Sequence, residues 1–234
     1  MRQPWKSISQ CLRLPIICAL CNEYHRGFLA ICDACQLTLP TIGPACFHCA
    51  LPLPEGHFLI CGHCCKNPPI VDHVIAAYRF DEPLRRLLHE FKYYEGLYLS
   101  SFLASLMTSH LSADALSTEC LIPIPLHPKR LRERGFNQAA ELTKHLSRTL
   151  QIPYNVTHCI KIIHTPAQAH LNAHERQKNL QKAFKTDPLP YEHVTLIDDL
   201  LTTGSTVHAL ANLLKQQGIR RVDVWCCARV ISSP

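Results

Sequence analysis

The sequence predicts an α/β protein with a mainly parallel sheet flanked by helices, preceded by a small region that a metal holds together. Three observations support this prediction. In the second part of the chain, short apolar runs alternate with helical apolar patterns, which is typical of βαβ units. Ten of the 14 cysteines lie in the first 65 residues. With 234 residues and 47% apolar content, the chain has enough material for one sizeable core beside a small domain.

Four C-x-x-C pairs dominate the N-terminal region. Each pair brings two thiolates to one side of a turn, so two pairs complete one tetrahedral zinc site and two ions are expected. Ten residues separate the first pair from the second, and 11 separate the third from the fourth. These short gaps favour sequential pairing, although a nested arrangement also fits. The expected ligands are Cys18, Cys21, Cys32, Cys35, Cys46, Cys49, Cys61 and Cys64.

A disulfide framework is the alternative reading of these cysteines, and the N-terminus argues against it. Residues 1–6 are not followed by an apolar run with a small-residue cleavage site. We therefore expect no secretory signal and a cytoplasmic location. In reducing cytosol, such cysteines bind metal rather than form disulfides. His63 and Cys65 flank Cys64 and stay open as substitute ligands.

The Pro-rich stretch 66–69 follows the last cysteine pair and marks the expected boundary. It divides the chain into a double zinc-ribbon region, 1–67, and an α/β domain, 68–234. No stretch approaches the ~18 consecutive apolar residues of a membrane span, so we expect no membrane insertion. The net charge of +6 suits ligands that carry phosphate, without predicting a nucleic-acid partner.

Strand and helix patterns alternate beyond this boundary. We expect strands over 71–79, 120–124, 158–163, 194–197 and 222–228. Helices are expected over 83–91, 97–111, 136–150 and 207–214. In open parallel sheets, ligands bind beyond the carboxyl ends of the strands. The segments that follow residues 124 and 197 are therefore the places to look for a site.

The segment 194–207 carries the strongest functional signal. Its expected strand ends at two adjacent acids, Asp198 and Asp199, and a hydroxyl-rich glycine loop then leads into a helix. Such a loop can hold a phosphate at the helix N-terminus, and the acids can accept hydrogen bonds from a sugar diol. A ribose 5-phosphate fits both. Helix capping is the alternative, but it needs one such residue only. The loop residues are Thr202, Thr203, Gly204, Ser205 and Thr206.

A run of four cations within six residues follows the expected strand 120–124 and leads to the next helix. Arginine offers forked donors and lysine a point charge, and both suit a polyanion such as pyrophosphate. The position of this run, at the carboxyl end of a strand, favours that role over a solvated charge run. The candidate ligands of pyrophosphate are Lys129, Arg130 and Arg134.

The segment 194–206 resembles the phosphoribosyl-diphosphate signature of the type I phosphoribosyltransferases, which reads strand, acid, acid, x, x, Thr, Thr, Gly, x, Thr. The resemblance implies the fold of that superfamily for the α/β domain. It also implies catalytic roles for Asp198 and Asp199 on the ribose hydroxyls, and a 5′-phosphate held by the loop 202–206. Mg²⁺ is expected to bind together with phosphoribosyl diphosphate.

Further segments are similar to the ComF family of competence-associated, phosphoribosyltransferase-like proteins. They are the paired cysteine knuckles and the residues 91–96, 123–138, 165–168, 175–180 and 183–184, in the order of that family. The resemblance implies a cytosolic factor of natural transformation, which binds phosphoribosyl diphosphate and helps to take up and handle single-stranded DNA. A helicase-like competence ATPase is the implied partner.

Three functional hypotheses follow. The first is a transferase that moves phosphoribose to an unidentified acceptor. The second is a non-catalytic adaptor that binds phosphoribosyl diphosphate or single-stranded DNA for the helicase-like partner. The third is a scaffold whose zinc ribbons dock that partner. The intact loop with Asp198 and Asp199 favours the first two, because a scaffold needs neither acid.

Overall fold

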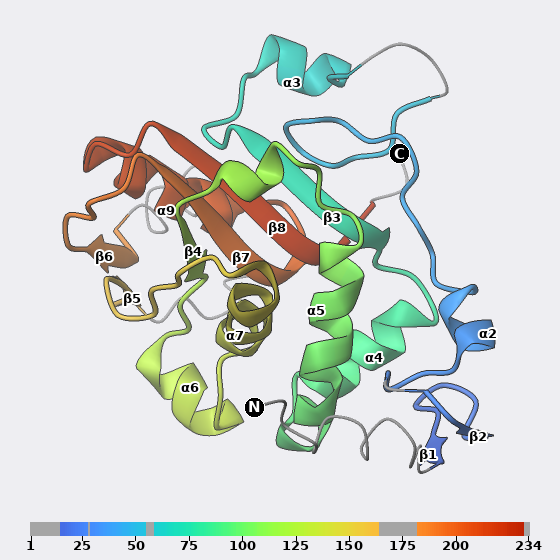
Figure 1. The fold of residues 1–234 in the computed structure, drawn as a ribbon. Helices are drawn as coiled ribbons and strands as arrows, with labels where there is room; N and C mark the ends of the chain where they lie inside the picture. Colours follow the sequence, from blue (N-terminus) through green and yellow to red (C-terminus); the bar gives the residue numbers. More distant parts are fainter. Residues whose placement is uncertain (1–14, 28, 55–58, 164–181, 232–234) are drawn as a thin grey trace, which may run out of the picture.

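Four parallel strands form the central sheet of the computed structural model, which describes residues 15–27, 29–54, 59–163 and 182–231. Their order across the sheet is β3-β8-β7-β4 (Figure 1). All three strand pairs are parallel, which confirms the predicted class. The bounds are β3 (His73–Arg79), β8 (Arg221–Arg229), β7 (His193–Leu201) and β4 (Cys120–Pro123).

Helices cover both faces of this sheet, as Figure 1 shows. One face carries α4 (Leu84–Phe91), α5 (Ser100–Thr108) and α7 (Gln138–Leu150), and the other carries α9 (Ser205–Gln216). The strands alternate accordingly, because successive side chains of a strand point to opposite faces. In β8, Trp225 packs against the first set of helices and its neighbour Val224 packs with α9.

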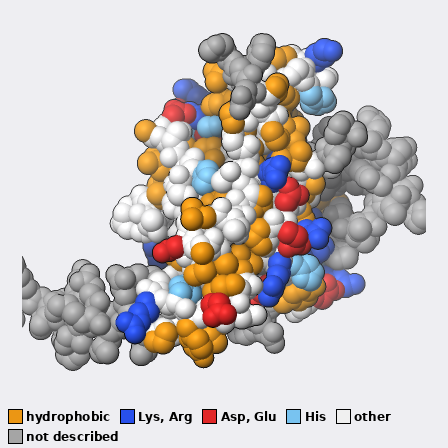
Figure 2. Space-filling view, turned by 90° about the vertical axis from the view of Figure 1, so that its right-hand side faces the viewer, with side chains coloured by type: hydrophobic (Ala, Val, Ile, Leu, Met, Phe, Trp, Pro, Cys, Tyr) orange, Lys and Arg blue, Asp and Glu red, His pale blue; other side chains and the backbone are white. Residues whose placement is uncertain are grey.

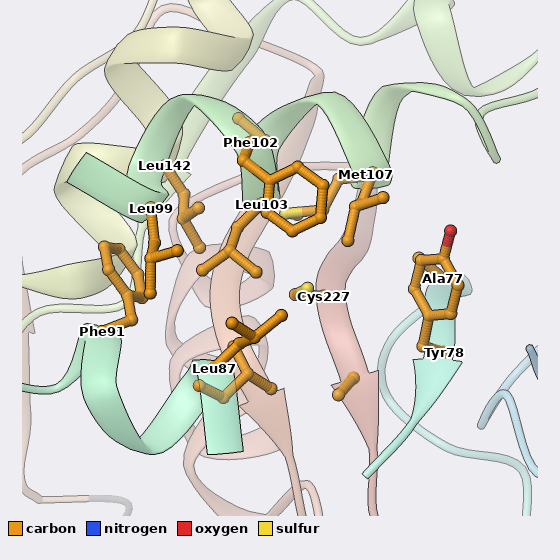
Figure 3. Close-up of a cluster of buried hydrophobic side chains, with 14 of the residues drawn as sticks. Ala77, Tyr78, Leu87, Phe91, Leu99, Phe102, Leu103, Met107, Leu142 and Cys227 are labelled. Atoms are coloured by element: carbon orange, nitrogen blue, oxygen red, sulfur yellow. The ribbon is translucent and has the colours of Figure 1, made fainter. Parts of the chain in front are cut away.

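The larger buried cluster lies between the sheet and helices α4, α5 and α7 (Figure 3). Phe91 of α4 and Phe102 of α5 are fully buried there, beside Leu142 of α7 and Cys227 of β8. The four cysteines outside the N-terminal region are all buried in the two clusters or beside them. Their burial agrees with the small hydrophobic role that free cysteine commonly has in cores.

Two segments depart from the expectations. The cation run after β4 forms a short helix, α6 (Pro128–Arg134), which is not among the expected helices. Proline at its first turn and left-handed Gly135 at its end start and stop this helix. The strand expected over 158–163 is shortened to β5 (Cys159–Lys161), which lies outside the central sheet. It pairs antiparallel with β6 (Phe184–Thr186) in a separate ribbon.

The N-terminal region runs along the open edge of β3. Thr41 forms an antiparallel bridge with Tyr78, and the N–H of Val74 donates to the carbonyl of Phe47 at 2.9 Å. Covering an edge strand in this way satisfies backbone groups that would otherwise invite another chain. The division after residue 67 stays a prediction.

The small elements are β1 (Ile16–Ile17), β2 (Tyr24–His25), α2 (Asp33–Gln36), α3 (Gly62–Lys66), η1 (Tyr94–Leu99) and η2 (Ala115–Ser117).

The molecular face on the side of α2 and the first two cysteine pairs is mixed in character. Figure 2 shows hydrophobic side chains on this face with charged side chains between them. No helix in the described part of the chain is long and apolar enough to cross a bilayer. The family-like segments 165–168 and 175–180 lie outside the described residues.

Candidate functional site

A cleft of about 690 Å³ opens at the carboxyl ends of β7 and β4. Five of the residues predicted from the sequence line it together: Arg130, Arg134, Asp198, Asp199 and Thr202. The remaining lining residues are Lys92, Tyr93, Leu126, His127, Glu133, Lys161 and Leu200. The acids at the end of one strand and the cations after its neighbour therefore meet, as the parallel-sheet rule predicts.

The acid pair lies within the last part of β7, because this strand continues to Leu201, four residues beyond the predicted end at residue 197. Asp198 Oδ1 accepts a hydrogen bond from the N–H of Asp199 at 2.9 Å. Asp199 Oδ2 is buried and has no hydrogen-bond partner among the described residues. An unpartnered buried acceptor costs free energy, and a ligand hydroxyl would remove that cost.

The two neighbouring carboxylates repel each other when both are ionised. Burial, and then the negative charge of Asp199, raises the pKa of Asp198 well above its ordinary value. Lys92 acts in the opposite direction but does not cancel the shift. A bound cation or a hydroxyl donor would favour the ionised form of the pair. The site is therefore electrostatically incomplete on its acidic side.

The cations lie on a helix, α6, and the helical spacing determines which of them line the cleft. Arg130 and Arg134 are four residues apart in α6 and thus share one face of the helix. Lys129 is exposed and is not among the residues that line the cleft. Its N–H instead donates to Nδ1 of His127, which caps the helix.

Arg134 is held in place by a chain of hydrogen bonds. Its Nη1 donates to Gln138 Oε1 at 3.0 Å, and Gln138 Nε2 donates to the carbonyl of Lys92 at 3.0 Å. Burial, and then the charge of Arg130, lowers the pKa of Arg134. Burial and Arg130 also lower the pKa of Lys161, which lies in β5. With Lys92, four cations thus line one cleft, and an anion would relieve their repulsion.

The loop 202–206 leads into the N-terminus of α9, and of its predicted residues Thr202 lines the cleft whereas Thr203, Gly204, Ser205 and Thr206 do not. Gly204 has a left-handed backbone, with φ of +76°, and a Cβ there would lie 3.3 Å from the ring of His208. Thr203 Oγ1 and Ser205 Oγ lie within hydrogen-bonding distance of each other at 2.9 Å. With α9 behind it, this loop offers hydroxyls and helix N–H groups of the kind that bind phosphate.

The eight predicted zinc ligands form two groups. The first comprises Cys18, Cys21, Cys32 and Cys35, and the second Cys46, Cys49, Cys61 and Cys64. In each group all four sulfur atoms lie within 4.8 Å of one another, which confirms sequential pairing. The Sγ atoms of Cys21 and Cys32 are 3.9 Å apart, and those of Cys49 and Cys61 are 3.7 Å apart. A tetrahedral ion with zinc–sulfur bonds of ~2.3 Å places its sulfurs about 3.8 Å apart, so both groups fit zinc.

Both cysteine groups share one pattern of N–H···S hydrogen bonds. The N–H of Cys32 donates to Cys18 Sγ at 3.4 Å, and the N–H of Cys61 donates to Cys46 Sγ at 3.2 Å. Burial raises the pKa of Cys18, but backbone N–H donors outweigh it and lower the pKa to about 6. These donors stabilise the thiolate, which is the form that binds metal. Cys65 is exposed and belongs to neither group.

Comparison with known proteins identifies the family. The chain is 35% identical over 224 residues to competence protein F of Haemophilus influenzae, an alignment that covers 91% of this chain and 96% of that protein. The chain belongs to the ComF family. It is also 32% identical over 227 residues to DNA utilization protein YhgH of Escherichia coli, covering 94% and 100% of the two chains. Competence protein ComFC of Bacillus subtilis is 24% identical over 226 residues, covering 87% and 90%. No family model matches.

The chemical argument from the sequence missed a residue of the cleft that lies in a segment similar to the ComF family. Lys92 lines the cleft although no charge pattern singled it out. Its only signal was the family-like segment 91–96. The glycine of that segment, Gly96, lies so close to the Glu90 carbonyl that a Cβ would clash with it. This close approach, which only glycine allows, packs the chain that follows Lys92 and Tyr93 against the end of α4.

Proposed function

We propose that the cleft binds phosphoribosyl diphosphate together with Mg²⁺. The observation that carries the proposal is the meeting of an incomplete acid pair with four cations in one cleft of about 690 Å³. A ligand with a diol and with phosphates at both ends complements both sides at once. Neither a simple sugar nor free phosphate would satisfy both the acids and the cations.

Each part of the ligand has matching residues. Asp198 and Asp199 accept hydrogen bonds from the ribose hydroxyls, and the loop 202–206 holds the 5′-phosphate. Arg130 and Arg134 bind the pyrophosphate through charge-assisted hydrogen bonds, with Lys161 beside them. Lys129 was expected in this role too, but its exposed position outside the cleft lining supports a weaker, long-range contribution. Carboxylate and phosphate oxygens are the ligands that Mg²⁺ prefers.

The chemistry that this geometry supports is transfer of phosphoribose, with pyrophosphate as the leaving group. The cations would stabilise the charge that develops on pyrophosphate as its bond to C1 of the ribose breaks. Incubation with phosphoribosyl diphosphate, Mg²⁺ and a panel of bases or single-stranded DNA tests turnover. Release of pyrophosphate that depends on one acceptor supports a transferase. Binding without release supports an adaptor.

The binding proposal predicts a sharp difference between two cations of α6. Arg134→Ala should weaken the binding of phosphoribosyl diphosphate about ten- to hundredfold, because a hydrogen bond to a charged group contributes about 1.5–3 kcal/mol. Lys129→Ala should weaken it less than about threefold, since an exposed charge contributes little. Calorimetric titration in the presence of Mg²⁺ measures both. Equal losses in the two variants would contradict this assignment of the cleft.

We also infer a cytoplasmic role in the use of incoming DNA. This inference rests on relatives named for competence and for DNA utilization, together with the basic cleft. Tyr93 supports direct contact with single-stranded DNA, because its side chain is 60% exposed at the cleft and can stack on a base. A helicase-like ATPase remains the partner that the family resemblance implies.

Competition distinguishes a shared cleft from a separate DNA surface. If single-stranded DNA contacts Arg130 and Arg134, binding should fall with salt at a slope of about −0.7 per phosphate contacted. Saturating phosphoribosyl diphosphate should then displace the DNA. Fluorescence anisotropy with a labelled oligonucleotide measures both effects. DNA binding that saturating phosphoribosyl diphosphate leaves unchanged would place the DNA on another surface.

A further inference from the structure

Arg229, the last residue of β8, is a buried cation whose side-chain hydrogen bonds, among the described residues, all go to backbone carbonyls. Its exposed fraction is 9%. Nε donates to the carbonyl of Cys49 at 2.9 Å. Nη1 faces the carbonyls of Leu201 at 3.1 Å and Val230 at 2.8 Å, and that of Thr202 as well. No carboxylate forms an ion pair with Arg229 in the part of the chain that the structure describes.

Apart from the carbonyl of the adjacent Val230, these carbonyls belong to two places that are far apart in sequence. Leu201 ends β7 and Thr202 begins the candidate phosphate loop, and Thr202 itself lines the cleft. Cys49 is one of the four ligands of the second cysteine group. The planar guanidinium offers donors in fixed directions, so it holds the two carbonyl sets in a fixed relative position. A single side chain thus links a metal group to the cleft.

The carbonyl of Cys49 is positioned by the turn that builds the metal group. The next residue, Ala50, has a left-handed backbone with φ of 55°, and its N–H donates to the carbonyl of Cys46 at 2.8 Å. Ala50 is buried in the same cluster as Leu201 and as Val207 of α9. The conformation of this turn therefore depends on four sulfur atoms that stay close together, which thiolates do only around a cation.

We propose that metal binding by the second cysteine group fixes the conformation of the loop 202–206 through Cys49 and Arg229. Loss of that metal opens the turn and withdraws the Cys49 carbonyl. The buried guanidinium then loses one of its acceptors and must shift, and the carbonyl of Thr202 shifts with it, whereas the carbonyl of Leu201 is also held by the N–H of Val230 at 2.9 Å. Arg229 acts here as a positioning residue, and the second metal group as a support of the cleft.

The first cysteine group is a natural control. It has the same C-x-x-C spacing within its pairs and the same N–H···S pattern, but it packs on the other side of the sheet, where Cys18 joins the cluster of α4 and α5. Among the described residues, no hydrogen bond joins the first group to the loop 202–206. Metal loss from the first group should therefore leave the loop unchanged.

Hydrogen exchange of the ligand-free protein tests the link without relying on any activity. The variants are Arg229→Gln and the double variants Cys61→Ser/Cys64→Ser and Cys32→Ser/Cys35→Ser, with elemental analysis of each. Arg220→Gln is the matched arginine control, because its side chain is 77% exposed. Exchange in β8 serves as the reference for global opening.

We expect amide exchange over residues 202–206 to rise at least tenfold, relative to β8, in Arg229→Gln and in the Cys61/Cys64 variant only. An unchanged rate in either of them, or an equal rise in the Cys32/Cys35 variant or in Arg220→Gln, overturns the proposal. The affinity for phosphoribosyl diphosphate with Mg²⁺ should fall in the same two variants, which rests on the proposed function. If the native protein does not bind that ligand, the proposed function fails while the exchange data still decide the link.

Discussion

A chain in which Asp198 and Asp199 are both replaced by Asn should lose about a hundred- to ten-thousandfold in affinity for phosphoribosyl diphosphate. Each carboxylate is expected to accept a charge-assisted hydrogen bond from a ribose hydroxyl, at about 1.5–3 kcal/mol apiece. Titration calorimetry with Mg²⁺ measures the loss. Asp187→Asn is the control, because Asp187 is exposed and does not line the cleft. Unchanged affinity in the double variant would show that the ribose lies elsewhere.

The same double variant should fold at least as stably as the native chain. The pKa of Asp198 is raised from its ordinary 3.8 by burial and by Asp199, so ionisation of this carboxyl destabilises the folded state. That cost is fully present above the folded-state pKa and vanishes as the pH falls towards 3.8. We expect a melting temperature about 2–4 °C higher at neutral pH, the shift that 1 kcal/mol produces in a chain of this size. The gain should shrink in acid, and a lower melting temperature at neutral pH would contradict this account.

Local sequence patterns predicted the acidic side of the cleft because its parts are contiguous. The apolar strand, Asp198 and Asp199, the glycine loop and the helix follow one another within 14 residues, 194–207. The meeting with the cations after β4 followed from one rule, namely that neighbouring parallel strands end at the same edge. The two cysteine groups were predictable for the same reason, because each pair is local and each gap is short.

Other features depend on contacts that no local pattern reveals. Lys92 reaches the cleft only because α4 packs across the sheet, and Arg229 bonds to Cys49, 180 residues earlier in the chain. The separation of β5 from the central sheet depends on its pairing with β6, which lies beyond residues 164–181. The helix α6 is different, because Pro128 and Gly135 did signal its start and end. Treating the run as charges alone obscured that signal, and Lys129, which the run also suggested, does not line the cleft.

Protein purified without added metal should contain two zinc ions per chain, and Cys18→Ser should contain one. Cys18 is fully buried and packs in the cluster of α4 and α5, so it links the first metal group to the core. Binding free energies of structural zinc, about 10–16 kcal/mol in finger peptides, are largely folding free energies. Removing this ligand should therefore unfold residues 15–39 and lower the melting temperature of the remaining chain. Elemental analysis and limited proteolysis measure the two effects.

Cys65→Ser is the matched control for the metal prediction, because Cys65 adjoins the ligand Cys64 yet is exposed and belongs to neither group. It should keep both ions and the native protease resistance. Cys120 offers a second comparison, since it is buried in the sheet but far from either group in sequence. Its replacement should destabilise the core by packing loss without releasing metal. Substoichiometric metal in the native protein, together with titratable disulfides among the eight ligands, would reject structural zinc and leave the N-terminal region as a disulfide framework.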